Sequence, residues 1–106
     1  IINENCRLVN TWVEDYALIA PEVYSIMRNH EYKKINIPII DQGYFDEIPP
    51  HVGKGVWIGA RVILLPGITV NHDSIISAGS VVTHDVPAFG IVGGIPARII
   101  KFRVHE

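Results

Sequence analysis

The chain has 106 residues, of which 48% are hydrophobic and 19% are charged, and its formal net charge is -2 at pH 7. This composition predicts one folded domain, excludes an intrinsically disordered chain, and gives no support to a nucleic-acid partner. We find no apolar run long enough for a transmembrane segment and no signal-peptide pattern, and the single cysteine, Cys6, excludes an internal disulfide and suits a reducing cytoplasm.

The first segment, residues 1–30, has aliphatic residues at loosely regular intervals. Ile2, Leu8, Val13 and Ile19 can face inward, although the step from Leu8 to Val13 is five residues rather than six. We therefore expect N-terminal coils with one irregular edge. Because the chain starts at Ile1 within this pattern, we also expect it to be a fragment of a longer chain.

Residues 31–51 interrupt the spacing. The segment contains Pro38, the pair Pro49-Pro50 and several polar and aromatic side chains. A loop of this length in so compact a chain is usually functional or disordered. We predict an inserted loop here.

Residues 52–87 carry a regular six-residue repeat. Gly53, Gly59 and Asn71 follow three of the aliphatic positions and tolerate a positive φ in a turn. A six-residue period fits neither a helix nor simple alternation, and it predicts a short strand followed by a turn. Three units would close a triangular coil of 18 residues, although short antiparallel strands are the alternative. The repeated aliphatic positions are Val52, Ile58, Leu64, Val70, Ile76 and Val82.

The pattern ends after Pro87. Gly93-Gly94-Ile95-Pro96 predicts a turn, and residues 97–102 are expected to form a short helix or strand that caps the last coil. The prediction for the whole chain is a single all-β domain, a three-sided parallel β-helix. It comprises N-terminal coils over 1–30, an inserted loop over 31–51, regular coils over 52–87 and a C-terminal cap over 88–106.

Five short motifs resemble those of the hexapeptide-repeat acyltransferases. They are GVWIGAR from Gly55, LPGITV from Leu65, SAGSVVT from Ser77, DVP from Asp85 and VGGIPAR from Val92. Residues 13–30 are similar to the coil that precedes the catalytic histidine in galactoside and maltose acetyltransferases. The runs RNHEY over 28–32 and IPIIDQG over 37–43 are most similar to polysaccharide O-acetyltransferases.

This resemblance implies a left-handed β-helix and a homotrimer. The handedness comes from the resemblance alone, because parallel crossovers are normally right-handed. It also implies that acetyl-CoA binds in the cleft between neighbouring prisms, with no metal. A thin prism with a small core would gain stability by assembling.

Acetyl transfer to a hydroxyl needs a base, and imidazole titrates near neutral pH. His30 opens the long loop and falls on the position of the family's catalytic histidine, although a solvated loop histidine is the ordinary alternative. Glu31 could orient its ring. We interpret His51 as a loop residue, His72 as solvated in a turn, and His105 as part of the tail.

The resemblance implies that six further positions bind acetyl-CoA. Ala60 and Ala78 would act through backbone groups, and the Ala60 N–H is the expected oxyanion donor. His84 stands where relatives usually carry lysine, which removes a permanent charge. The alternative for the two alanines is ordinary coil packing, and the alternative for Arg98 and Lys101 is a solvated basic tail. The six positions are Ala60, Ala78, Thr83, His84, Arg98 and Lys101.

The acceptor site is predicted from aromatic residues, because aromatic faces stack well on sugar rings. Trp57 should lie on the outer face of a coil, and Tyr32, with Tyr44 and Phe45, could form a wall of the acceptor site. The sugar-binding aspartate of the galactoside enzymes falls on Leu8, so the acceptor should be held differently here.

The prediction for function is transfer of acetyl from acetyl-CoA to a hydroxyl of a sugar or polysaccharide precursor in the cytoplasm. We expect direct attack with His30 as base and no acyl-enzyme, because Cys6 is far from the loop in sequence. Three alternatives stay open: N-acetylation of an amino sugar, a zinc carbonic anhydrase and a non-catalytic trimeric scaffold. The zinc enzyme needs three converging histidines, which whole 18-residue steps do not provide here.

Overall fold

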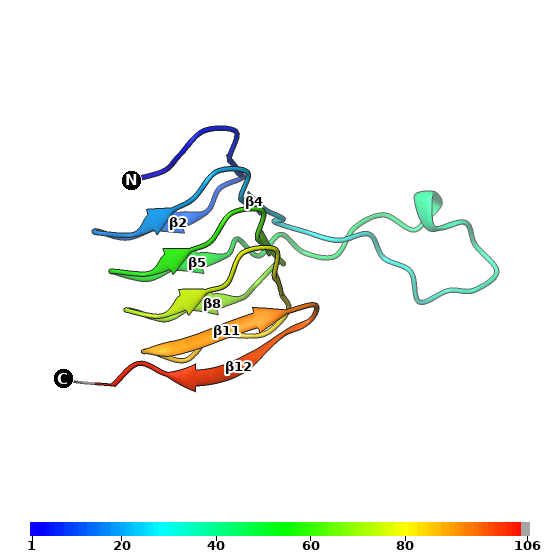
Figure 1. The fold of residues 1–106 in the computed structure, drawn as a ribbon. Coiled ribbons are helices and arrows are strands. Elements are labelled where there is room, and N and C mark those ends of the chain that lie inside the picture. Colours follow the sequence, from blue (N-terminus) through cyan, green and yellow to red (C-terminus); the bar gives the residue numbers. More distant parts are fainter. Residues whose placement is uncertain (105–106) are drawn as a thin grey trace.

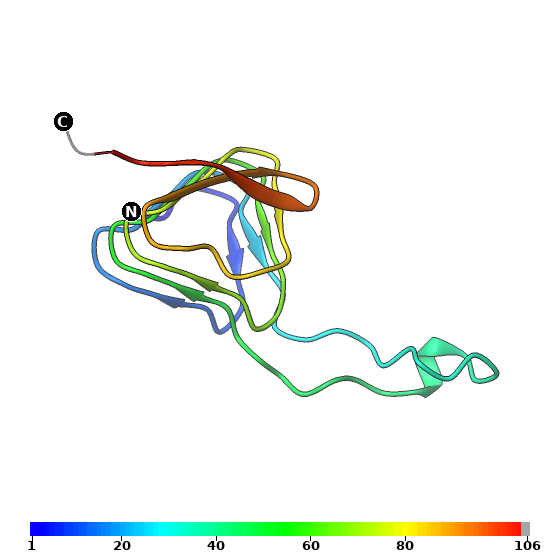
Figure 2. The same cartoon turned by 90° about the horizontal axis from the view of Figure 1, so that it is seen from below.

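A computed structural model describes residues 1–104, which form a three-sided stack of short parallel strands. Figure 2, a view along the stack, shows the coils lying over one another as nested triangles. Three sheets make the three faces of this prism. The β4 face consists of β1 (Arg7–Leu8), β4 (Tyr24–Ser25), β7 (Ile63–Leu64) and β10 (Val81–Val82).

The other two faces complete the prism. The β5 face consists of β2 (Trp12–Val13), β5 (His51–Val52) and β8 (Thr69–Val70). The β6 face consists of β3 (Leu18–Ile19), β6 (Trp57–Ile58), β9 (Ile75–Ile76), β11 (Gly90–Gly94) and β12 (Ala97–Phe102).

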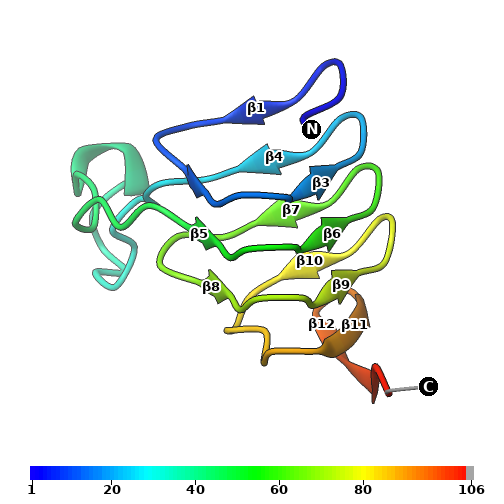
Figure 3. The ribbon, with the colours of Figure 1, turned by 90° about the vertical axis from the view of Figure 1, so that its left-hand side faces the viewer.

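The strand register gives the length of each coil. Parallel pairing joins Arg7 to Tyr24 in the first coil, a step of 17 residues, and His51 to Thr69 in the regular part, a step of 18. The last step, from Ile75 to Ile91, is 16 residues. Figure 3 shows the strands of successive coils stacked in order. The expected all-β, left-handed parallel β-helix is confirmed.

The core is the inside of the triangle, and the repeat explains it. The second residue of each two-residue strand from β5 to β10 points inward and is at most 1% exposed. Four residues later stands a second buried position, which is Ser74 and Ser80 in two successive six-residue repeats. Each serine hydroxyl donates to the carbonyl oxygen three residues earlier, at 2.7 Å, so burial leaves neither hydroxyl unpaired.

The turns correct one expectation about glycine. Gly53 and Gly59, like Asn71, do not have a positive φ. The left-handed residues stand two positions further on, at Gly55, Arg61 and Asp73, with φ of 70°, 58° and 59°. Gly59 is needed for another reason, because a Cβ there would lie 2.6 Å from the Ala78 nitrogen of the next coil.

Residues 27–50 leave the prism as a long arm, which Figure 1 shows extending sideways from the corner between β4 and β5. Its two limbs pair through backbone bonds from Glu31 to Gly43 and from Phe45 to Asn29, both 2.9 Å. The tip holds the one helical element of residues 1–104, a 3-10 turn over Ile39–Asp41. Gln42 braces the tip by donating to the carbonyls of Lys34 and Ile37, both at 2.7 Å.

The C-terminal end is closed by a hairpin. β12 pairs antiparallel with β11, which itself continues the β6 face. Residues 97–102 are therefore a strand, one of the two forms expected from the sequence. Within residues 1–104, no helix has the length and apolar character required to cross a bilayer.

Candidate functional site

His30 lies in the first limb of the arm, where it pairs with Tyr44 in an isolated antiparallel bridge. The rings of these residues stack with centroids 4.3 Å apart. The Arg28 guanidinium lies 3.9 Å from the centroid of the same Tyr44 ring and forms an ion pair with Glu47 at 3.3 Å. His30 is exposed, so its imidazole is held by stacking and remains open to a ligand.

The other histidines occupy separate surroundings. His51 is the first residue of β5, which corrects the expectation of a loop residue, and its Nε2 lies 2.6 Å from Glu14 Oε2. His72 is exposed in a turn, as expected, with Nδ1 3.0 Å from Asp73 Oδ2. Across residues 1–104 there is no group of three side chains that could hold a metal ion. His105 lies outside the described residues.

Ala60 and Ala78 lie one above the other at the corner where the β6 face turns into the β4 face, which we call the alanine corner. They line one recess together with Pro21, Glu22 and Arg61. The Gly79 N–H donates to the Ala60 carbonyl at 2.8 Å. By contrast, neither the Ala60 N–H nor the Ala78 N–H donates a hydrogen bond within residues 1–104. This corner therefore presents two free backbone donors side by side.

The basic positions gather at the C-terminal end of the prism. His84 and Arg98 line a common recess beneath the last coil. Thr83 Oγ1 is 2.9 Å from His84 Nδ1, which holds this side-chain pair together. Lys101 is exposed on β12, opposite Ile91 of β11, and its ammonium has no ion-pair partner among residues 1–104.

Trp57 and Tyr32 are both exposed, at different places. Trp57 stands on the outside of the β6 face with 51% exposure, in register between Leu18 and Ile75, and so belongs to an apolar column. Tyr32 lies in the arm, edge-on to Phe45 with centroids 5.9 Å apart. Tyr44 packs against His30 and Arg28 instead, so the three arm aromatics do not form one flat wall.

The structure does not bring all the predicted site residues together within one chain. The arm with His30 leaves from the corner between the β4 and β5 faces, whereas Ala60 and Ala78 lie on the opposite edge of the β4 face. Thr83 and His84 follow β10 and thus share the corner of the arm, two coils away.

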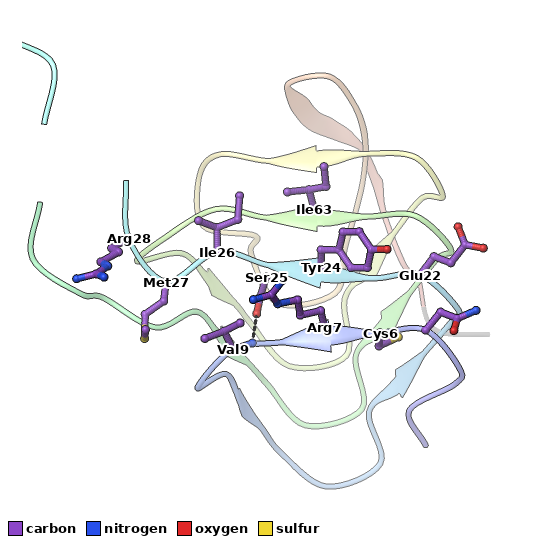
Figure 4. A pocket seen from close by; sticks show the side chains of 11 residues that line it. Cys6, Arg7, Val9, Glu22, Tyr24, Ser25, Ile26, Met27, Arg28 and Ile63 are labelled. Carbon is purple, nitrogen blue, oxygen red and sulfur yellow. Dashed lines mark hydrogen bonds between the residues drawn. The ribbon is translucent and has the colours of Figure 1, made fainter. Parts of the chain in front are cut away.

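A recess on the outside of the β4 face was not predicted from the sequence. Figure 4 shows its lining, in which Tyr24, Ile26 and Ile63 carry the apolar part. Arg7 and Arg28 also line it. Cys6, which is far from the loop in sequence, stands in the wall of this recess and donates its thiol to the Ala20 carbonyl at 3.2 Å. The sequence could have indicated this recess through the first residue of each two-residue strand, which faces outward. The six-residue repeat identifies only the second residue, which faces inward.

Comparison with known proteins places the repeat in a described family. The model of the bacterial transferase hexapeptide (six repeats) matches residues 49–84. The galactoside O-acetyltransferase of Escherichia coli K12 is 33% identical over 102 residues, which are 93% of this chain and 49% of that protein. This chain therefore spans about half the length of that relative.

Solved structures give the same result. A galactoside acetyltransferase in complex with coenzyme A is 34% identical, with a TM-score of 0.76, over 87% of this chain and 44% of that one. A hexapeptide-repeat-containing acetyltransferase of Vibrio cholerae, complexed with acetyl coenzyme A, is 30% identical, with a TM-score of 0.86. That likeness covers 95% of this chain and 55% of the Vibrio chain.

Proposed function

The chain belongs to the hexapeptide-repeat acyltransferase superfamily, and from this premise we propose that it transfers an acetyl group from acetyl-CoA to a hydroxyl of a sugar or polysaccharide precursor. The observation that carries the proposal is the likeness of almost the whole chain to an acetyltransferase solved with acetyl coenzyme A. The choice of a hydroxyl acceptor rests on the likeness to the galactoside O-acetyltransferase.

His30 is the proposed general base. When bound, acetyl-CoA supplies the acetyl group as an activated thioester. An unprotonated ring nitrogen of His30 takes the proton of the acceptor hydroxyl as its oxygen attacks the thioester carbon. The Ala60 N–H donates to the oxygen that becomes negative in this step. His30 then returns the proton to the departing thiolate of CoA, so the protein ends the cycle unchanged.

The free donors at the alanine corner suit the cofactor proposed there. The pantetheine arm of CoA is rich in amides, whose carbonyl oxygens need N–H donors, and the Ala78 N–H is available for one. The small alanine side chains permit close approach to the backbone. Arg98 and Lys101, with Thr83 and His84, would then meet the phosphates, where guanidinium and ammonium groups form charge-assisted hydrogen bonds.

A homotrimer would complete the site. In one chain the arm carries His30 away from its own alanine corner, so a second copy would bring the base of one chain to the alanine corner of another. The apolar column of Leu18, Trp57 and Ile75 on the β6 face supports such an assembly, because a neighbouring prism would cover it. We place the reaction in the cytoplasm, which suits the free thiol of Cys6.

The test is acetyl transfer from acetyl-CoA to a panel of neutral and charged sugars and amino sugars. The assay follows release of the CoA thiol, and mass spectrometry locates the added acetyl group. Product acetylated on oxygen supports the proposal. Product acetylated only on an amino nitrogen shows an N-acetyltransferase, and absence of turnover by a folded protein that also fails to bind CoA points to a scaffold.

A further inference from the structure

The recess on the β4 face, here called the β4 pocket, crosses this face from the root of the arm to the alanine corner. Arg28 and Met27 stand at the arm end, and Glu22, which also lines the alanine recess, stands at the other end (Figure 4). Between them lie the exposed side chains of Tyr24 and Ile26. The arm end of this pocket therefore lies beside the limb that carries the proposed base.

Its charges are unevenly distributed. Arg7 has no ion pair and no side-chain hydrogen bond within residues 1–104, and in Figure 4 its guanidinium points toward the arm end, away from Glu22. Glu22 is itself neutralised by Arg61, with Nε and Oε2 3.1 Å apart. Arg28, at the arm end, is paired with Glu47 at 3.3 Å, so the uncompensated positive charge of the pocket comes from Arg7.

The arm end of the pocket also lies close to His30. Arg28 and His30 are two residues apart in an extended limb, a span of about 7 Å. Both contact the ring of Tyr44, the guanidinium at 3.9 Å and the imidazole at 4.3 Å between centroids. A molecule seated in the β4 pocket against Arg28 would thus lie within reach of the proposed base.

We infer that the β4 pocket binds the acceptor, that the acceptor is a sugar bearing a carboxylate or phosphate group, and that Arg7 recognises this anionic group. The inference rests on the proposed function and adds the chemical class of its substrate. Guanidinium groups bind carboxylates and phosphates through two parallel hydrogen bonds, whereas a neutral sugar would leave the Arg7 charge without a counterion. Tyr24 and the isoleucines provide the surface on which the apolar side of the sugar ring packs.

Binding of matched sugars tests the inference without knowledge of the true acceptor. The chain, labelled with ¹⁵N-arginine, is titrated with glucuronate, glucose 1-phosphate and glucose, in the presence and in the absence of CoA, while the Nε–H resonance of Arg7 is followed. We expect saturable shifts with at least one anionic sugar, at an affinity about tenfold or more above that for glucose. The two anionic probes separate the sources: a response to glucuronate alone assigns a carboxylate, and a response to glucose 1-phosphate alone assigns a phosphate.

Arg7→Gln should reduce the affinity for the anionic sugar about tenfold or more, and Arg7→Lys should retain part of it. Both variants should keep the wild-type Tm, because the side chain is exposed and unpartnered within the described part of the chain. Arg103→Gln is the matched control, since Arg103 lies outside the pocket and donates to the Asp73 carbonyl at 2.8 Å.

The inference is overturned if glucose binds as well as the charged sugars, if none of the three binds, or if Arg7→Gln leaves their affinities unchanged. The preceding CoA titration keeps the two proposals separate. CoA binding without Arg7-dependent sugar binding refutes only the acceptor class. Arg7-dependent sugar binding without CoA binding refutes the acetyltransferase and keeps the anionic-sugar site.

Discussion

The side chain on which the proposed chemistry depends is His30. Its ring stacks on Tyr44 and forms no ion pair within residues 1–104, so its removal should disturb the fold little. We expect His30→Ala to lower kcat by about 10²- to 10⁴-fold, the usual contribution of a general base, while CoA affinity stays within about twofold. Steady-state kinetics and calorimetry measure the two quantities.

His72→Ala is the control for this substitution, because His72 is also exposed and also contacts an aromatic ring, that of Phe89. It should leave kcat unchanged. Equal losses in both variants, or a His30→Ala enzyme with full activity, would remove His30 from the mechanism.

The role of the Ala60 N–H can be tested with proline, because the preceding coil already has a proline at the equivalent turn position. Pro21 occupies the place that Ala60 occupies one coil later, as the pairing of Ile19 with Ile58 shows. The turn therefore accommodates proline, which has no N–H. Ala60→Pro should lower kcat by about 10²- to 10³-fold with a nearly unchanged Tm. Unchanged kcat in a folded variant would exclude this N–H as the oxyanion donor.

At the scale of the element, the coil turn explains which glycines are indispensable. Gly59 has an ordinary φ, but the next coil approaches so closely that any side chain collides with the Ala78 backbone. We expect Gly59→Ala to lower the free energy of unfolding by about 1–3 kcal/mol through overpacking. Urea denaturation followed by circular dichroism measures it.

Gly43→Ala provides the comparison. Gly43 has a φ of 83°, but a Cβ added to it would meet no atom within 4 Å, and it lies in the arm rather than in the prism. Its substitution should strain the arm locally by about 1 kcal/mol and leave the cooperative unfolding of the prism unchanged. If Gly43→Ala destabilised the prism as much as Gly59→Ala, close coil stacking would not be the reason for glycine at 59.

The coil could be predicted because its inward positions repeat every six residues, and burial of Val52, Ile58 and Leu64 follows directly from that spacing. The turn geometry could not, because the sequence shows glycine without showing whether φ or close approach demands it. The path of the arm and the pairing of His30 with Tyr44 depend on contacts between residues far apart in sequence. The β4 pocket could not be predicted for the same reason, since Arg7 and Arg28 come to line one recess only when the coil closes.

At the scale of the whole molecule, the proposed site requires more than one copy. Leu18 and Trp57 are neighbours on the β6 face, with 42% and 51% exposure. A charged side chain at this position would be buried without a partner in the proposed interface, which costs free energy. Leu18→Glu should therefore convert trimers into monomers and abolish acetyl transfer, with both results read from light scattering after gel filtration and from the thiol-release assay.

Lys54→Glu is the control for assembly, because Lys54 is exposed in the turn between β5 and β6, outside the apolar column. It should remain trimeric and active. A wild-type chain that is monomeric and fully active would contradict the proposal that neighbouring copies share the site.

The central claim is that this chain holds CoA, and a calorimetric titration of the folded chain with CoA tests it most directly, because no acceptor is needed. We predict saturable binding at one CoA per subunit, weakened about tenfold or more in Arg98→Gln through loss of a charge-assisted contact to phosphate. Absence of binding by a folded, assembled chain would contradict the acetyltransferase proposal and leave a β-helix that serves as a scaffold.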